Sequence, residues 1–293
     1  MRREKGFTLV ELLVVVGIIG LLAGILVPTI QVAIRIVEQK ACMANLRNVG
    51  TALATYQAGN RQQWPWIAGV TSDWSAVATG TNRDSDLPAG ADEPAGERSI
   101  TALMFLLVRD GQPAKLFVCP GDRQAAEDKD VFRDHDGDDE TPPEYRWDFA
   151  SADNVSYSWQ APIRRGEKYV NGIGESFAAA AVMADQSPKA TDVSWQPTPM
   201  REQTPAHEIR SNMSRNHGGG AVINVLRVDN SVIEAKRPDV GFADDNIYTA
   251  SGRKYNGSRE AVSLSLAQHY CPADTCLIGP VFDAGQDEEP PEE

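Results

Sequence analysis

The hydrophobic pattern opens with a long apolar run near the N-terminus. Residues 7–27 are apolar apart from Thr8, the glycines and one carboxylate, Glu11. As a helix, these 21 residues would extend for about 30 Å, which matches the hydrocarbon thickness of a bilayer. Three basic residues precede the run within the first five positions. The pattern therefore predicts a single membrane-spanning helix with its N-terminus in the cytoplasm.

Helical periodicity continues beyond the apolar run. After Pro28, apolar residues recur at helical spacing: Val32, Ile36, Met43, Leu46, Val49 and Leu53. Gly59 and Asn60 form a plausible stop. We predict one helix over about 8–58, with 7–27 in lipid and 28–58 amphipathic and packed on a globular domain. A coiled coil is the alternative, but the stretch is too short for several heptads.

The remaining pattern predicts an α+β fold in which the long helix packs on an antiparallel sheet with long loops. The globular domain should cover 59–284, followed by a disordered acidic tail over 285–293. Its expected elements are a short helix over 100–111, strands over 115–120, 154–162 and 179–187, and a hairpin over 219–237 with a two-residue turn at Asp229-Asn230. Polar stretches over 78–99 and 121–148 should form loops.

The charge at Glu11 needs an explanation, because a charge inside a membrane span is by default functional and requires a partner. A cleaved secretory signal would have a shorter apolar region and a small-residue cleavage site, which this run lacks. A plain membrane anchor explains the length of the run but not the glutamate. Neither interpretation accounts for the whole segment.

The segment KGFTLVELL resembles the N-terminal signature of type IV pilins and type II secretion pseudopilins. The resemblance implies that residues 1–6 are a leader peptide, that prepilin peptidase cuts between Gly6 and Phe7, and that Phe7 becomes a methylated N-terminus. It also implies a partner for Glu11, namely the terminal ammonium of a Phe7 in the growing filament. A paired buried charge is tolerated where a lone one is not.

The part of the chain beyond the membrane-spanning run carries a second resemblance. The segments CMANLRNVG, FVCPGD, SYSW, VMADQSP and NHGGGAVINVLRVDNSV are similar to a bacterial pseudopilin-like family with a C-terminal His-Gly-Gly…Asp-Gly hairpin. Here the hairpin runs from His217 to Asp229, and Asn230 stands where that family usually has glycine. Asparagine tolerates the left-handed conformation of such a turn.

Net charge limits the possible partners. The chain has 28 basic and 41 acidic residues, a net charge of −13, which argues against nucleic acid as the main partner. The pilin resemblance implies prepilin peptidase, other pilin or pseudopilin subunits and an inner-membrane assembly platform as partners. It also implies a single-pass protein of the bacterial inner membrane whose C-terminal domain is periplasmic or part of an extracytoplasmic filament.

Four cysteines lie beyond the predicted span, on the side expected to be oxidising: Cys42, Cys119, Cys271 and Cys276. Disulfides are therefore expected. Cys271 and Cys276 are close enough to close a small loop, which leaves Cys42 with Cys119 in a bridge that would join the helix to the domain. A metal site is the weaker interpretation, because the spacings form no pair of CxxC motifs and the histidines are scattered.

An acidic stretch, DHDGDDE, is a candidate calcium loop. Its alternating oxygen ligands would be Asp134, Asp136, Asp138 and Glu140. It does not follow the EF-hand spacing, and a solvated acidic loop is the alternative. Calcium is the one cofactor that the sequence raises.

The run from His217 to Gly220 is similar to the glycine-rich oxyanion loop of some esterases, but the chain contains no G-x-S-x-G nucleophile motif. We expect no enzyme here. The glycines should allow a close approach to the hairpin, and His217 should make a structural hydrogen bond.

Two functional classes remain open from sequence. The first is a structural subunit that enters a helical filament through its N-terminal helix. The second is a membrane-tethered domain that binds calcium or a glycan and does not polymerise. In the second class Trp64, Trp66 and Trp74 could stack on sugars, although packing against the helix is the more economical use for them.

Overall fold

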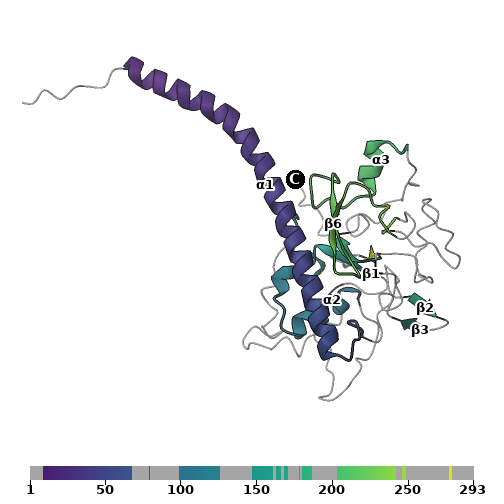
Figure 1. Ribbon diagram of the computed structural model, residues 1–293. Helices are drawn as coiled ribbons and strands as arrows, with labels where there is room; N and C mark the ends of the chain where they lie inside the picture. Colours follow the sequence, from purple (N-terminus) through teal and green to yellow (C-terminus); the bar gives the residue numbers. More distant parts are fainter. Residues whose placement is uncertain are drawn as a thin grey trace, which may run out of the picture.

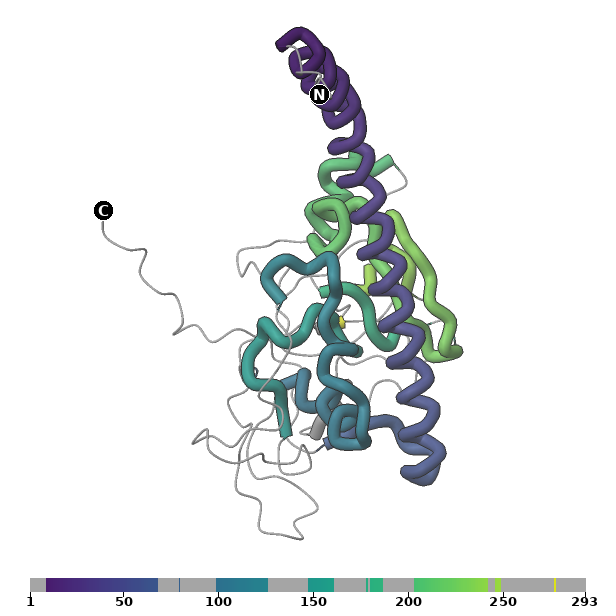
Figure 2. Tube along the Cα trace, turned by 90° about the vertical axis from the view of Figure 1, so that its left-hand side faces the viewer, coloured from purple at the N-terminus to yellow at the C-terminus, as the bar shows by residue number. Residues whose placement is uncertain are grey.

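A computed structural model shows a long helix that runs along a globular domain and projects well beyond it (Figures 1 and 2). The structure describes residues 9–67, 79, 99–125, 147–160, 163–165, 168–170, 178, 180–186, 203–241, 246–248 and 277–278. The α+β class predicted from sequence is confirmed.

Helix α1 spans Leu9–Gly59, within one residue of each predicted end. Pro28 lies inside it without ending it. After Gly59 the chain turns, as the side-chain amide of Asn60 donates to the carbonyl of Tyr56 at 2.9 Å. The Gly59-Asn60 stop is therefore confirmed.

The two halves of α1 have different surroundings. All of its buried residues belong to the second half: Cys42, Met43, Leu46, Val49, Gly50, Ala52 and Leu53. The predicted contact stripe was too long, because Val32 and Ile36 are 58% and 53% exposed. Contact with the domain begins at Glu38, burial becomes complete at Cys42, and residues 9–37 of the helix are exposed.

The described part of the domain contains two short α-helices and two 3-10 helices. Helix α2 spans Thr101–Arg109, as predicted, and is followed by the 3-10 helix η1 (Ala114–Phe117). The strand predicted over 115–120 is wrong: after Pro113 the chain makes one 3-10 turn, and Phe117 then accepts a single bond from the amide of Ser156 at 2.8 Å. The others are η3 (Ala152–Asn154) and α3 (Ala206–Ser211).

The main sheet has five antiparallel strands in the order β6-β5-β4-β1-β7. Their bounds are β1 Tyr157–Gln160, β4 Ala181–Asp185, β5 Ile223–Arg227, β6 Val232–Ala235 and β7 Leu277–Ile278. The strands predicted over 154–162 and 179–187 are thus present. A separate two-stranded ribbon joins β2 (Ile163–Arg165) to β3 (Lys168–Val170).

The β5–β6 hairpin is confirmed, but its turn differs from the prediction. Arg227 donates its amide to the carbonyl of Ser231 at 2.9 Å, so the loop comprises three residues, Val228 to Asn230. Asn230 closes it with a φ of +65°. Three-residue loops that end in a left-handed residue preserve strand twist, and asparagine adopts that conformation readily.

The core has two parts, one on each face of the sheet. Leu226 and Met183 belong to the larger part, which also contains α2 and the buried face of α1. Ile223 and Val225 alternate with Leu226 along β5 and belong to the smaller part, with Tyr248. Trp64 and Trp66 pack against the larger core, whereas Trp74 lies outside the described residues.

Candidate functional site: the exposed helix and a buried polar cluster

The first half of α1 is an apolar surface with one charge near its end. Nineteen large apolar side chains between Leu9 and Val37 are each 46% to 78% exposed. α1 is long and apolar enough to cross a membrane, and among the described helices it alone meets that test. Contiguous apolar surface of this extent indicates contact with lipid or with other protein.

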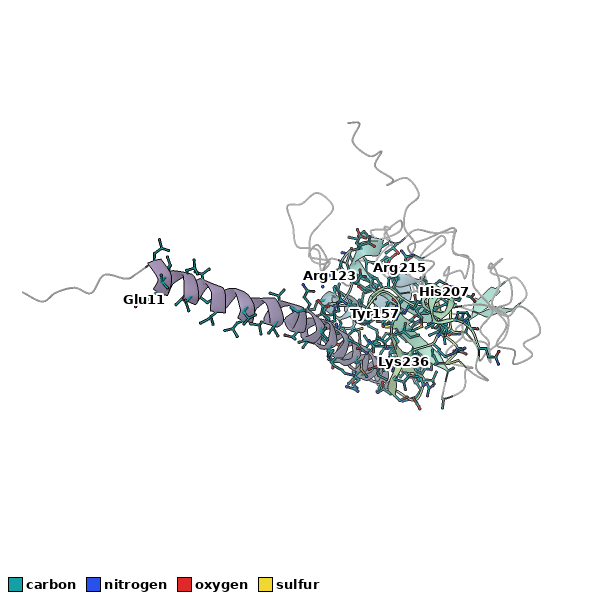
Figure 3. All side chains as sticks on the ribbon, turned by 90° about the horizontal axis from the view of Figure 1, so that it is seen from above. Glu11, Arg123, Tyr157, His207, Arg215 and Lys236 are labelled. Carbon is teal, nitrogen blue, oxygen red and sulfur yellow. The ribbon has the colours of Figure 1, made fainter. Side chains whose placement is uncertain are left out.

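Glu11 lies in the first turn of α1, at the end far from the domain (Figure 3). It is exposed, as are the apolar residues that follow it. Gly6 and Phe7, the predicted processing site, lie outside the described residues. The geometry therefore places the predicted assembly glutamate on the projecting part of the helix.

Two surface ion pairs bind α1 to the domain where it first meets it. Lys40 Nζ lies 2.9 Å from Glu234 of β6, and Arg123 contacts Glu38 at 3.2 Å. Exposed pairs of this kind contribute roughly 0–1 kcal/mol each. The buried part of the interface must therefore supply most of the attachment.

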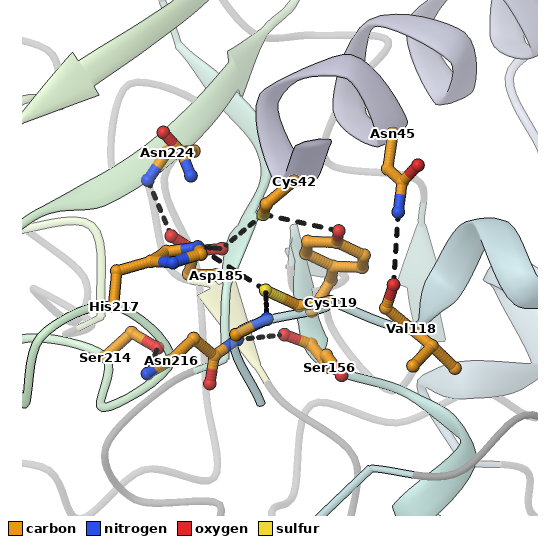
Figure 4. Close-up of polar contacts among 12 residues, drawn as sticks. Cys42, Asn45, Val118, Cys119, Ser156, Asp185, Ser214, Asn216, His217 and Asn224 are labelled. Atoms are coloured by element: carbon orange, nitrogen blue, oxygen red, sulfur yellow. Dashed lines mark hydrogen bonds and ion pairs between the residues drawn. The ribbon is translucent and has the colours of Figure 1, made fainter. Parts of the chain in front are cut away.

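A cluster of four polar side chains lies in that buried part, which we call the thiol cluster: Cys42, Cys119, Asp185 and His217 (Figure 4). Cys42 comes from α1 and Cys119 from the segment after η1. Asp185 ends β4, and His217 belongs to the loop before β5. The exposed fraction of each is 4% or less.

The thiol cluster brings two sulfurs, a carboxylate and an imidazole together. Cys42 Sγ lies 3.0 Å from Asp185 Oδ1, and His217 Nε2 lies 3.5 Å from the same oxygen. Cys119 Sγ lies 3.4 Å from His217 Nε2. All four candidate donor atoms lie within 4.8 Å of one another.

Two hydrogen bonds hold Asp185 in place, one to its carboxylate and one to its backbone carbonyl. The amide of Asn224 donates to Asp185 Oδ2 at 2.7 Å, which leaves Oδ1 to face the cluster. The Tyr248 hydroxyl donates to the backbone carbonyl of Asp185 at 2.8 Å. The end of β4 is thus fixed by hydrogen bonds from Asn224 and from Tyr248.

The imidazole is positioned by its loop. Gly218, Gly219 and Gly220 all have φ between +60° and +85°, a region that glycine adopts at no steric cost. On the other side, a Cβ added to Gly121 would lie 2.8 Å from His217 Nδ1. Of the glycines expected to allow a close approach to the hairpin, Gly220 instead lies against α3, where an added Cβ would be 2.6 Å from the carbonyl oxygen of Arg210, and the glycine close to His217 is Gly121.

Burial and the nearby Asp185 together shift the pKa values of the cluster. Burial raises the pKa of the Cys42 thiol well above its ordinary value. Burial also lowers the pKa of His217, but the hydrogen bond and negative charge of Asp185 outweigh it and raise that pKa to about 10. These directions favour a protonated His217 and a neutral Cys42 thiol in the metal-free cluster.

The sequence-predicted cysteine sites divide into two groups. Cys42 and Cys119 are brought together as predicted, but both are free thiols, so their bridge stays a prediction. Cys271 and Cys276 lie outside the described residues, as do the calcium candidates Asp134, Asp136, Asp138 and Glu140. The structural role expected for His217 is consistent with its buried contacts.

Asp185 is the member of the cluster that sequence reasoning missed. It is a carboxylate at the end of the apolar run AAAVMAD, in a strand whose every residue is buried. A charged residue is almost never fully buried unless it is paired. A carboxylate at the end of a buried apolar run was therefore the sequence signal that could have identified Asp185 as a member of a polar cluster.

Comparisons with known proteins bear on the N-terminus. The family model described as "Prokaryotic N-terminal methylation motif" matches residues 1–27. The type IV major fimbrial protein FimA of Dichelobacter nodosus is 34% identical over 102 residues, which are 33% of this chain and 60% of that protein. No solved structure gives a significant match.

The methylation motif, the fimbrial relative and the projecting helix together support a type IV pilin-like protein. The chain combines a long apolar helix with a globular domain built on an antiparallel sheet. The chain spans about three-fifths of the length of the curated relative that it matches.

Proposed function

We propose that this chain is a structural subunit of a type IV pilus-like or pseudopilus filament. The observation that carries the proposal is the exposed first half of α1, which coincides with the methylation motif over residues 1–27. Nineteen exposed apolar side chains need a lipid or protein environment. The membrane provides lipid before assembly, and the core of a filament provides protein contacts after it.

Glu11 has a defined part in this proposal. Prepilin peptidase cuts after Gly6, and the new amino group of Phe7 lies within the apolar layer. The carboxylate of Glu11 in one subunit pairs with that ammonium in another and sets the register of docking. Phe7 and Glu11 both lie within the first five residues of the processed chain, so the pair between subunits forms near the tip of the helix.

The exterior domain favours a pseudopilin or minor subunit over a compact major one. The chain has 234 residues after Gly59, and every copy in a filament must find space for them. The subunit is anchored in the inner membrane before assembly, with the assembly platform as its partner there. Its role is structural, without a chemical reaction.

Incorporation of Glu11 variants into filaments tests this proposal. Glu11→Ala should leave the chain folded and membrane-bound but exclude it from sheared filaments or from cross-linked subunit ladders. Glu38→Ala is the matched control, because it removes the same side chain from the same helix beyond the apolar run; it also loses the surface ion pair with Arg123, which contributes only roughly 0–1 kcal/mol. Equal incorporation of both variants would overturn the proposal and favour a membrane-tethered domain.

A further inference from the structure

We propose that the thiol cluster is a structural zinc site, in which Cys42, Cys119, Asp185 and His217 bind one Zn²⁺. The site lies where α1 meets the domain, and its ligands come from four segments far apart in sequence. It is a different site from the acidic stretch considered for calcium, and it is independent of the pilin-like assembly.

The donor set is the first argument. Two thiolate sulfurs, one imidazole nitrogen and one carboxylate oxygen are all ligands that Zn²⁺ uses in proteins, and four protein ligands make a closed, structural type of site. Calcium and magnesium prefer oxygen donors and would leave the sulfurs unused. The mixture of soft and harder donors therefore selects zinc.

The spacing of the donors is the second argument. Tetrahedral zinc with bonds of about 2.0–2.3 Å places neighbouring ligand atoms about 3.3–3.8 Å apart. The distance from Cys119 Sγ to His217 Nε2 is 3.4 Å, and that from His217 Nε2 to Asp185 Oδ1 is 3.5 Å. The 3.0 Å between Cys42 Sγ and Asp185 Oδ1 needs to widen by about half an ångström.

The groups around the ligands are the third argument. The amide of Gly121 donates to Cys119 Sγ at 3.3 Å, and the Tyr157 hydroxyl lies 3.3 Å from Cys42 Sγ. Such hydrogen bonds stabilise negative charge on thiolates. The bond from Asn224 to Asp185 Oδ2 orients the carboxylate so that it offers one oxygen, as outer-shell partners of metal ligands commonly do.

Charge and protons balance in the bound state. Two thiolates, one carboxylate and a neutral imidazole carry −3 in total, so the zinc complex has a net charge of −1. Binding releases the thiol protons and the imidazolium proton to solvent, because metal ligands must be deprotonated. The gain is four metal–ligand bonds across the interface between α1, η1, β4 and the loop before β5.

A disulfide between Cys42 and Cys119 is the competing state of the same two sulfurs. It would leave His217 and Asp185 as a buried pair without the sulfur contacts. Zinc uses all four groups, which is why the arrangement favours it. The zinc-bound pair of thiolates and the disulfide differ by one metal ion and by two electrons. Once the metal is removed and the chain is denatured, the reduced pair carries two hydrogens that the disulfide lacks, so the two states can be separated by direct measurement.

The test uses the full chain, extracted from membranes in detergent without chelator. Metal analysis should find one zinc per chain, and peptide mapping after denaturation should find Cys42 and Cys119 alkylated. After chelator treatment under reducing conditions, added Zn²⁺ should rebind stoichiometrically. Added Co²⁺ should give the visible spectrum of a tetrahedral thiolate complex, a readout that does not depend on any variant.

Variants locate the metal. His217→Gln and Cys119→Ser should weaken zinc binding by at least about a hundredfold, more than the 10–100-fold typical of outer-shell partners. His207→Gln is the matched control, because His207 is exposed and lies outside the cluster. A Cys42–Cys119 disulfide peptide, or free thiols that fail to bind added Zn²⁺ and Co²⁺, would overturn the proposal.

Discussion

Cys42 Sγ on the long helix lies 3.0 Å from Asp185 Oδ1 at the end of a central strand. The two residues are 143 positions apart, and both are fully buried. This contact joins the helix that carries the pilin-like signature to the sheet of the exterior domain. The thiol cluster is thus the buried polar centre of the interface, with the ion pairs of Glu38 and Lys40 at its edge.

Removal of the carboxylate should destabilise the metal-free chain strongly. Asp185→Ala leaves the amide of Asn224 buried without its acceptor. It also removes the partner that keeps His217 protonated, so burial lowers the pKa of that imidazole and forces it to give up its proton inside the interface. Loss of one partner of a buried ion pair costs about 3–5 kcal/mol. Urea unfolding of the chelator-treated protein at neutral pH measures this change.

The control for that measurement is Asp110→Asn, which alters an exposed carboxylate and should change the free energy of unfolding by less than about 0.5 kcal/mol. If Asp185→Ala were as stable as this control, the buried pair would not hold the interface.

A methyl group at residue 121 should displace the imidazole. In Gly121→Ala the new Cβ would lie 2.6 Å from the carbonyl of Asn216 and 2.8 Å from His217 Nδ1. Overpacking of this kind typically lowers the free energy of unfolding by about 1–3 kcal/mol. We expect that loss in thermal or urea unfolding, together with weaker zinc binding. Gly59→Ala, where a Cβ meets no atom within 4 Å, should show neither effect.

The contact between α1 and the β5–β6 turn should be sensitive to side-chain size at residue 50. A Cβ on Gly50 would lie 1.7 Å from Asn230 Oδ1, but that exposed side chain can rotate away. Alanine also gains up to about 1 kcal/mol of helix propensity over glycine, so Gly50→Ala should be nearly neutral.

A larger side chain at the same position has no such escape. The Cβ of either variant lies 3.1 Å from Cδ1 of Leu226, which alanine can accommodate by a small shift, but Gly50→Val adds two methyl groups beyond that Cβ and would press on the buried Leu226 and the turn together. We expect a loss of about 1–3 kcal/mol in the free energy of unfolding. Equal stability of the two variants would show that the hairpin does not pack on α1 as described.

The hairpin turn should contribute a small, pH-dependent stability. Hydrogen bonds from the hydroxyl and amide of Ser231 lower the pKa of Asp229 below its ordinary value of 3.8. A carboxyl whose pKa is lower in the folded chain stabilises it above the unfolded pKa, and this contribution is lost as pH falls through the folded pKa.

Because Asp229 is exposed, the effect should stay below about 1 kcal/mol. Asp229→Asn should therefore be slightly less stable than the unmodified chain at pH 6, and the difference should shrink below pH 4. Urea unfolding at both pH values measures it, and a difference that grows on acidification would contradict the assignment.

Local sequence signals predicted most of the fold. The length of α1, the helix at α2, strands β1 and β4 and the β5–β6 hairpin all follow from periodicity and from glycine or asparagine at their ends. The strand predicted over 115–120 was wrong, because a short apolar run does not distinguish a strand from a 3-10 turn that tertiary contacts bury.

The thiol cluster was harder to predict, because its members meet through the fold and not through a motif. Cys42 and Cys119 lie close together, as the predicted bridge requires, although both are free thiols, and Asp185 and His217 join them from β4 and from a loop. Their spacing in sequence matches no metal motif, so only the antiparallel order of the sheet brings them together.

The central claim, that this is a processed pilin-like subunit, is tested most directly by the N-terminus of the protein in its own membranes. Mass spectrometry of the intact chain and of its N-terminal peptide should show loss of residues 1–6 and one added methyl group on Phe7. An uncut N-terminus, or a cut beyond residue 27, would contradict the account.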